Sequence, residues 1–142
     1  MIRFMTGPVQ NINWDQAAQV FERAPLGAQR RDPDKLRRAF QAGYASVYVF
    51  DSRLLIGLAR ALCDGEYQAA VYDVVLLPEY QGQGLGRDMM ERLCKLLPVE
   101  NIILYAVPGV ESFYAACGFR RMRTAMARLS HTMSAVGVGY LE

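Results

Sequence analysis

The sequence predicts a mixed α/β domain, and three features support this. Hydrophobic residues recur with helical spacing in two segments near the N-terminus and with strand-like composition in three consecutive segments over residues 46–77. A further helical pattern over residues 84–97 precedes another apolar segment, which is the order of a parallel strand–helix–strand unit. The length of 142 residues suits one core, so we expect a single domain over residues 1–142.

The N-terminal part is expected to form a strand and a helix. Residues 2–5 are apolar and predict an opening strand. Asn13 is a favourable N-cap for the helix, and Gln16 is placed to bond back to it as in a capping box. Pro25 and Gly27 are expected to end this helix. Its predicted apolar face consists of Trp14, Ala17, Ala18 and Phe21.

A second helix is expected directly afterwards. Asp32 can cap its N-terminus, Pro33 suits the first helical position, and Gly43 is expected to end it. The apolar residues that should face the core are Leu36, Ala39 and Phe40.

Three antiparallel strands follow in the prediction, over residues 46–50, 54–62 and 68–77. Polar residues 51–53 separate the first two, and Asp64 with Gly65 gives a strong turn signal between the second and third.

The C-terminal half is expected to complete the parallel unit and to close the sheet. Leu85, Met89, Leu93, Leu96 and Leu97 form the apolar stripe of the helix over residues 84–97, which Pro98 should end. A parallel strand over 101–107 and a short helix over 109–117 follow, with Gly118 as its left-handed C-terminal residue. Residues 120–141 alternate weakly and predict one or two closing strands.

Composition excludes several classes of protein. The net charge is +2 with acidic and basic residues interleaved, which gives no concentrated basic face for nucleic acid. The three cysteines have no metal-ligand spacing, so no metal site is expected, and no apolar run reaches the roughly 20 residues needed to span a bilayer. The odd cysteine count without an export signal favours a reducing compartment, so we expect a cytoplasmic protein without membrane or nucleic-acid partners.

The most informative segment is a glycine-rich loop between the third strand and the next helix. Alternating glycines allow sharp turns, and the N–H groups at a helix N-terminus attract anions, so the loop suits a phosphate or pyrophosphate. Arg87 can add a full positive charge. The residues expected to bind the ligand are Gln81, Gly82, Gln83, Gly84, Leu85, Gly86 and Arg87. The alternative is an ordinary glycine-rich turn.

Two other phosphate-binding motifs do not fit this loop. A Walker A loop requires Gly-Lys-Ser/Thr, whereas residues 86–88 read Gly-Arg-Asp. A dinucleotide fingerprint requires a third glycine three positions after the second, and the two possible registers place Arg87 or Met89 there.

The pattern Gln81-x-x-Gly84-x-Gly86 resembles the Gln/Arg-x-x-Gly-x-Gly/Ala signature of the GNAT superfamily of N-acetyltransferases. The segment 74–80 is similar to the strand and Pro-Glu-Tyr that precede this loop in the family, and 112–119 is similar to its Phe-Tyr…Gly-Phe segment. The resemblance implies the GNAT fold: a mostly antiparallel mixed sheet with one central parallel pair and flanking helices. More loosely, residues 59–65, 72–75 and 81–86 resemble the branch with serotonin-type (aralkylamine) N-acetyltransferases.

The resemblance also implies a co-substrate and roles for individual residues. Acetyl-coenzyme A would place its pyrophosphate on the glycine loop and its pantetheine arm along Val74, Val75 and Leu76, where a main-chain N–H could also stabilise the oxyanion. Tyr114 would lie beside the coenzyme sulfur and protonate the departing thiolate; its phenol has a reference pKa near 10. The alternative for Tyr114 is a core residue on an apolar helical stripe.

The general base is left open by the sequence. Asp73 is a carboxylate in the apolar strand 71–77, where it accepts the ammonium proton through water, holds the amine by its charge, or is a buried hydrogen-bond partner for a neighbouring loop. Asp64 and Glu66 in the preceding turn are weaker candidates, and His131 is expected to be structural. Three tyrosines either line an aromatic acceptor pocket or pack in the strands: Tyr44, Tyr48 and Tyr67.

Three functions remain open at this point. The first is transfer of the acetyl group from acetyl-CoA to a primary amine of a small molecule, by direct attack on the thioester and without a metal. The second is acetylation of a protein N-terminus or lysine by the same fold. The third is a coenzyme A-binding regulatory module without turnover, which predicts an intact glycine loop beside a damaged reaction centre. A homodimer is implied by the family resemblance.

Overall fold

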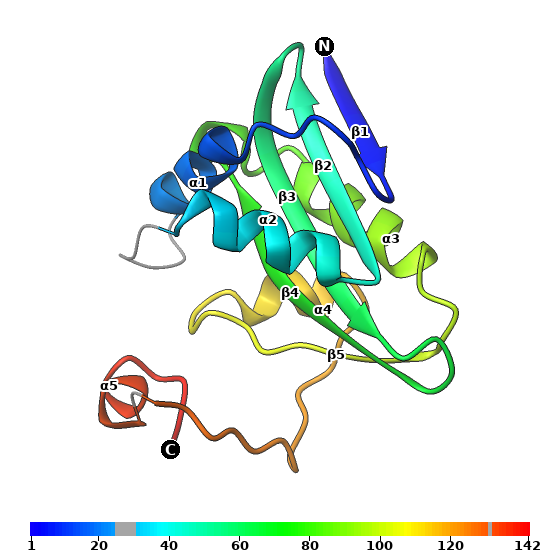
Figure 1. Cartoon of the computed structure of the whole chain (residues 1–142). Coiled ribbons are helices and arrows are strands. Elements are labelled where there is room, and N and C mark those ends of the chain that lie inside the picture. Colours follow the sequence, from blue (N-terminus) through cyan, green and yellow to red (C-terminus); the bar gives the residue numbers. More distant parts are fainter. Residues whose placement is uncertain (25–30, 131) are drawn as a thin grey trace. The chain divides into compact units, whose positions relative to one another are not determined.

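The structure is a computed structural model that describes residues 1–24, 31–130 and 132–142 (Figure 1). It divides into two compact units, Met1–Leu104 and Tyr105–Glu142, and each is described here by itself. The predicted helix-ending residues Pro25 and Gly27, and His131, lie outside the described residues. None of the described helices is long and apolar enough to cross a membrane.

The first unit is built on a five-stranded mixed sheet with the order β1-β2-β3-β4-β5. The first four strands pair antiparallel, and β5 pairs parallel with β4. This confirms the predicted mixed sheet, although the parallel pair lies at one end of it. The strands are β1 Ile2–Thr6, β2 Ala45–Asp51, β3 Leu54–Cys63, β4 Gln68–Leu76 and β5 Asn101–Ile103.

Helices cover both faces of this sheet. Figure 1 shows α1 (Trp14–Arg23) and α2 (Pro33–Ala42) on one face and α3 (Leu85–Lys95) on the other. The predicted caps form: Asn13 accepts a hydrogen bond from the Gln16 backbone N–H at 3.1 Å, and Asp32 accepts one from the Lys35 N–H at 3.2 Å. Fully buried side chains from the sheet and from α3 fill the core, among them Val47, Val49, Ile56, Leu58, Met89, Met90 and Leu93.

Two details of the helices differ from the prediction. The Gln16 side chain does not complete a capping box, because its Oε1 accepts a hydrogen bond from the Leu55 N–H of β3 at 3.1 Å. In α3, Leu96 is 37% exposed, whereas Met90 is buried. Leu96 is the C-cap residue of this helix, beyond its last regular turn, so its side chain leaves the apolar stripe.

A β-bulge interrupts β4. Leu58 pairs with Val75 and Arg60 pairs with Tyr72, so two steps along β3 correspond to three along β4. The extra residue lies at Asp73 and Val74, and Asp73 has a positive φ of 58°. A bulge of this kind bends its strand and redirects a side chain.

The strand β5 is shorter than predicted. It ends at Ile103, and it pairs only with residues 68–70 of β4. The strand thus ends one residue before Leu104, the last residue of the first unit. The prediction of a strand over 101–107 is therefore wrong in length but right in direction.

The second unit contains two short helices, α4 (Glu111–Ala116) and α5 (Thr132–Gly137). Gly118, with a φ of 94°, ends α4 in a Schellman arrangement: the Phe119 N–H bonds to the Tyr114 carbonyl and the Gly118 N–H to the Ala115 carbonyl. The predicted closing strands are absent from residues 120–130 and 132–142. Residues 120–128 are exposed, so no apolar face is buried there that would hold a strand against a sheet.

Candidate functional site

The glycine loop leaves its backbone open at the start of α3. Gly82 and Gly84 have positive φ angles of 77° and 85°, and a Cβ added at either position would meet no atom within 4 Å. Gly84 is the N-cap of α3, and no side chain caps the first turn. The first N–H groups of a helix without a side-chain cap carry partial positive charge, so this loop can receive an anionic group.

Side chains on three sides anchor the segment that leads into the loop, the 3₁₀ turn η1 (Pro78–Tyr80). The Tyr80 hydroxyl donates to Oδ2 of Asp51 at 2.7 Å, and Arg23 of α1 forms an ion pair with Glu79. The Arg23 guanidinium holds the pKa of the Glu79 carboxyl below its usual range. The Nε2 of Gln81 donates to the Leu76 carbonyl at 3.0 Å, so this predicted ligand-binding side chain is used to hold the loop to the end of β4.

The predicted pantetheine strand has a free edge in the first unit. Val74, Val75 and Leu76 pair with β3 on one side, and in the described part of residues 1–104 no strand pairs with their other side, because β5 ends earlier. The Leu77 N–H continues the ladder by bonding to the Ile56 carbonyl at 2.8 Å. An extended chain with amide groups can therefore add to this edge as a further strand does.

Asp73 lies in the bulge and is held by two arginines. Its Oδ2 is 2.7 Å from Nε of Arg60, and its Oδ1 is 2.9 Å from a terminal nitrogen of Arg31. The Asp73 side chain is only 11% exposed and that of Arg60 17%. One carboxylate oxygen thus accepts a charge-assisted hydrogen bond from Arg60, and the other forms an ion pair with Arg31. The hydrogen-bond partner of Asp73 is thus Arg60 of the neighbouring strand β3 rather than a residue of a loop, and proton transfer by Asp73 stays a prediction.

The weaker carboxylate candidate Asp64 has a structural function in the β3–β4 turn. Its Oδ1 accepts hydrogen bonds from the N–H groups of Glu66, Tyr67 and Gln68 at 2.7 to 3.0 Å. These backbone bonds, that of Tyr67 above all, lower the pKa of Asp64.

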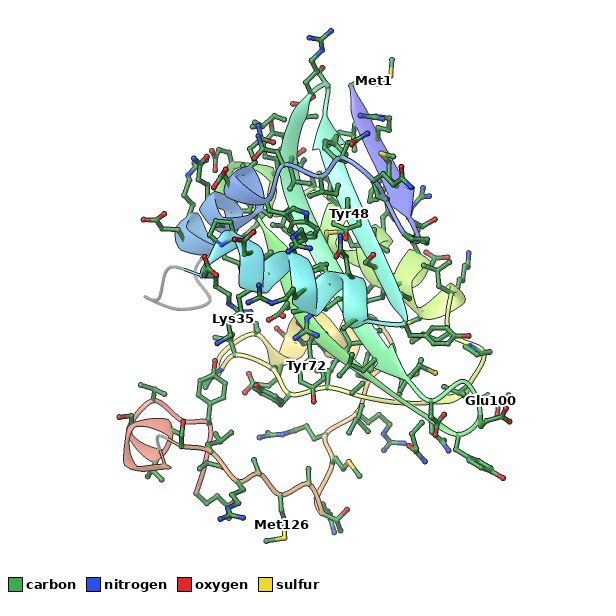
Figure 2. All side chains as sticks on the ribbon, viewed as in Figure 1. Met1, Lys35, Tyr48, Tyr72, Glu100 and Met126 are labelled. Carbon is green, nitrogen blue, oxygen red and sulfur yellow. The ribbon has the colours of Figure 1, made fainter. Side chains whose placement is uncertain are left out.

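The three tyrosines expected either to line an acceptor pocket or to pack in the strands differ in burial. Tyr48 is 3% exposed and packs against Trp14 and Phe40, on the sheet face that α1 and α2 cover (Figure 2). Tyr44 and Tyr67 are 49% and 75% exposed. Strand packing therefore explains Tyr48.

Tyr114 belongs to α4 of the second unit. Its ring contacts those of Phe113 and Phe119, with centroid distances of 5.0 and 6.2 Å. Burial, with a smaller contribution from Cys117, raises the pKa of Tyr114 to about 12. The phenol therefore keeps its proton at neutral pH.

Comparison with known proteins shows the family. Residues 43–121, more than half of the chain, match the model of the acetyltransferase (GNAT) domain. The chain belongs to the GNAT acetyltransferases. The match covers β2 to α4 and includes the glycine loop, Asp73 and Tyr114.

Individual relatives agree with this GNAT assignment. The chain is 40% identical to GCN5-related N-acetyltransferase 1, chloroplastic, of Arabidopsis thaliana, over 78% of this chain and 57% of that protein. It is 43% identical to serotonin N-acetyltransferase 2, chloroplastic, of Oryza sativa subsp. japonica, over 71% and 53%. The chain thus spans about half the length of these relatives. A GNAT-family acetyltransferase from Streptococcus pneumoniae has the same fold, with a TM-score of 0.76, 20% identity, and coverage of 92% of this chain and 99% of that one.

Sequence reasoning missed several residues that hold Asp73 and the segment before the glycine loop. Arg60 and Arg31 bind Asp73, Tyr80 bonds to Asp51, and Arg23 pairs with Glu79. One of these was open to prediction: Arg60 and Asp73 are opposite charges within two neighbouring, otherwise apolar strands, which is the pattern of a cross-strand pair. The other partners come from segments that only the fold brings together.

Proposed function

We propose that the chain is an acetyl-CoA-dependent N-acetyltransferase that acts on a primary amine of a small molecule. Membership of the GNAT family supports acetyl transfer, and the name of the rice relative supports a small amine as the acceptor. The observation that carries the proposal is the open loop at the N-terminus of α3, where Gly82 and Gly84 adopt left-handed conformations with free space above them.

The residues of the loop fit a pyrophosphate. A side chain at Gly82 or Gly84 would require a strained backbone, because both residues have a positive φ. We assign the pyrophosphate of coenzyme A to the backbone of residues 82–87, with the exposed Arg87 at the rim. The free edge of Val74, Val75 and Leu76 is assigned to the amide-bearing pantetheine arm.

Acetyl-coenzyme A, when bound, supplies an activated acetyl thioester. The chain's part in the reaction is to hold this group and the amine in the geometry for direct attack, which alone lowers a barrier by several kcal/mol. A main-chain N–H in residues 74–76 is proposed to donate to the carbonyl oxygen as negative charge develops there. Because the β3 ladder and the bulge hold these residues, such a donor needs no reorganisation.

Tyr114 is proposed to hold a proton for the departing sulfur. Its raised pKa means that the phenol is present as a donor across the physiological range. Because the pKa of Tyr114 lies above that of a typical thiol, complete proton transfer from the phenol to the thiolate is unfavourable. We therefore assign Tyr114 a hydrogen bond to the developing thiolate instead of full proton transfer.

The test compares two glycine variants with the wild type. We expect Gly84→Ala to weaken coenzyme A binding about tenfold in calorimetry, because alanine disfavours the left-handed conformation by about 1–2 kcal/mol. Gly7→Ala is the matched control: Gly7 also has a positive φ with open space around it, but it lies at the end of β1. It should lower stability without changing the affinity.

Turnover is then measured by thiol release from acetyl-CoA with a panel of small amines and peptides. Transfer to small amines supports the proposal, whereas transfer only to peptides identifies a protein acetyltransferase. Coenzyme binding without transfer to any acceptor identifies a regulatory module. A glycine-loop variant that binds coenzyme A as tightly as the wild type would overturn the assignment of the loop.

A further inference from the structure

The bulge of β4 depends on a residue type that does not favour its conformation. Asp73 has a φ of 58°, in the left-handed region that most non-glycine residues avoid, although aspartate tolerates it better than alanine. Such a conformation persists only where surrounding contacts hold it. The register places it between the pairs Arg60–Tyr72 and Leu58–Val75, directly before the free edge of residues 74–76.

Arg60 ties the bulge to β3 and α2. It pairs across the ladder with Tyr72, the residue before the bulge, and its Nε bonds to Asp73. The Arg60 guanidinium lies 5.5 Å from the ring centroid of Tyr72 and 5.9 Å from that of Phe40 in α2. The rings of Tyr72 in β4 and Phe40 in α2 thus fix the guanidinium, which can hold the carboxylate in one place.

Arg31 ties the same carboxylate to the helical layer. It forms an ion pair with the second oxygen of Asp73, and its guanidinium lies 4.6 Å from the ring centroid of Phe21 in α1. Through Arg60 and Arg31, contacts from α1, α2 and β3 therefore converge on one side chain in the bulge. Two guanidinium groups thus hold the two oxygens of one carboxylate.

From these contacts we propose that Asp73 is a positioning residue, which Arg60 and Arg31 clamp to hold the β4 bulge and so to direct the backbone of residues 74–76 toward the coenzyme. The inference rests on the proposed function in one respect, the identity of the ligand on this edge. In this inference Asp73 positions the backbone instead of transferring a proton, and Arg60 and Arg31 hold its carboxylate in place.

The test uses three substitutions that all remove the carboxylate but differ in backbone preference: Asp73→Asn, Asp73→Gly and Asp73→Ala. Asparagine keeps a hydrogen-bond acceptor and tolerates a positive φ, glycine keeps only the backbone freedom, and alanine keeps neither. A positioning residue predicts graded losses of coenzyme A affinity and of kcat, smallest for Asn and largest for Ala, with about tenfold between Gly and Ala in Kd. A proton acceptor predicts equal losses of kcat in all three, with the affinity unchanged.

A fourth variant separates the clamp from the carboxylate itself. Arg60→Met leaves Asp73 in place but removes one partner, so it should weaken coenzyme A binding and speed hydrogen exchange of the amides of residues 72–76. Arg60→Lys, which keeps the charge, should restore part of both. Asn11→Ala is the matched control, since Asn11 also has a positive φ of 68° but lies before α1; it should change neither the affinity nor the exchange of β4.

Failure of the clamp and failure of the proposed function give different results. Wild-type protein that binds coenzyme A but acetylates no amine removes the proposed function, while the affinities of the variants still decide the clamp. If the wild type binds no coenzyme A, the exchange rates of residues 72–76 must still follow the order Asn, Gly, Ala. Equal turnover losses with unchanged affinity and exchange would overturn the clamp and make Asp73 the base.

Discussion

The hydroxyl of Tyr80 donates a hydrogen bond of 2.7 Å to Oδ2 of Asp51, and this bond joins the end of β2 to the turn that precedes the glycine loop. Asp51 closes the β2–β3 hairpin, and Tyr80 is the last residue of η1. The glycine loop that precedes α3 therefore begins at a residue that is anchored to the sheet.

Loss of this bond should weaken binding at the proposed coenzyme site. We expect Tyr80→Phe to raise the Kd for coenzyme A about three- to tenfold, because the net contribution of a hydrogen bond of this type corresponds to a factor of that order. Calorimetric titration measures the change. Tyr67→Phe is the control, since Tyr67 is 75% exposed on the β3–β4 turn, and it should leave the Kd as it is.

The same contact predicts a pH dependence of stability at the acidic end. The Tyr80 hydroxyl, with the Met1 ammonium adding to it, lowers the pKa of Asp51 in the folded protein. A lowered carboxyl pKa adds stability above the unfolded value of about 3.9, and this stability is lost as pH falls through the folded value. The midpoint temperature of thermal unfolding should thus fall more steeply with decreasing pH in the wild type than in Tyr80→Phe, below about pH 4. Parallel curves of midpoint temperature against pH would speak against the contact.

Removal of the Tyr114 hydroxyl should affect turnover rather than coenzyme binding. We expect Tyr114→Phe to lower kcat at least several-fold and to leave the Kd for coenzyme A unchanged, because the proposed hydrogen bond forms as charge develops on the sulfur. Unchanged turnover would remove Tyr114 from this role.

The raised pKa of Tyr114 also predicts the shape of the pH–rate profile. A phenol with a pKa of about 12 keeps its proton well beyond pH 10, so Tyr114 should produce no fall in kcat between pH 8 and about 11. Because the pKa of Tyr114 is higher in the folded than in the unfolded protein, its protonated phenol contributes to folding stability below the unfolded pKa near 10. This contribution is lost as pH rises through about 12. A basic limb near pH 9 that disappears in Tyr114→Phe would contradict this assignment.

Gln16 should be a stability residue, although it lies in the first turn of α1. Its side chain satisfies the N–H of Leu55, a residue that is 1% exposed. Gln16→Ala leaves that N–H without its partner and should cost about 1–3 kcal/mol in the free energy of unfolding. Urea denaturation measures the loss, and Gln19→Ala, exposed in the same helix, should stay within about 0.5 kcal/mol of the wild type.

Gly57 should tolerate no side chain, because it lies opposite Leu76 on the β3–β4 ladder. A Cβ there would come within 2.8 Å of a Leu76 side-chain carbon and 3.0 Å of the Val75 carbonyl oxygen. Gly57→Ala should therefore destabilise the fold by about 1–3 kcal/mol and disturb the edge assigned to pantetheine. Denaturation and coenzyme titration should both change, whereas Gly7→Ala should leave the titration unaltered.

Features that depend on neighbouring residues could be predicted from the sequence. The caps at Asn13 and Asp32, the left-handed Gly118 and the glycine loop all follow from local backbone preferences, and the apolar periods located four of the five strands within one or two residues at each end. The family also follows, because its loop signature is contiguous in the chain. The single domain, the cytoplasmic location, the homodimer and the roles of the site residues stay predictions.

Tertiary structure decided what depends on residues far apart in the chain. The weak alternation of residues 120–141 gave no strands among the described residues 120–130 and 132–141, since a strand needs a partner with a buried face, and β5 ended at Ile103, paired only with residues 68–70 of β4. The bulge itself comes from one extra residue relative to β3, which no local pattern in β4 reveals. The sequence by itself thus determined the helix caps, four of the strands and the glycine loop. Only long-range packing placed Arg31 and Arg60 on Asp73 and the Gln16 side chain on the Leu55 N–H, because the residues in each contact lie far apart in the chain and only folding brings them together.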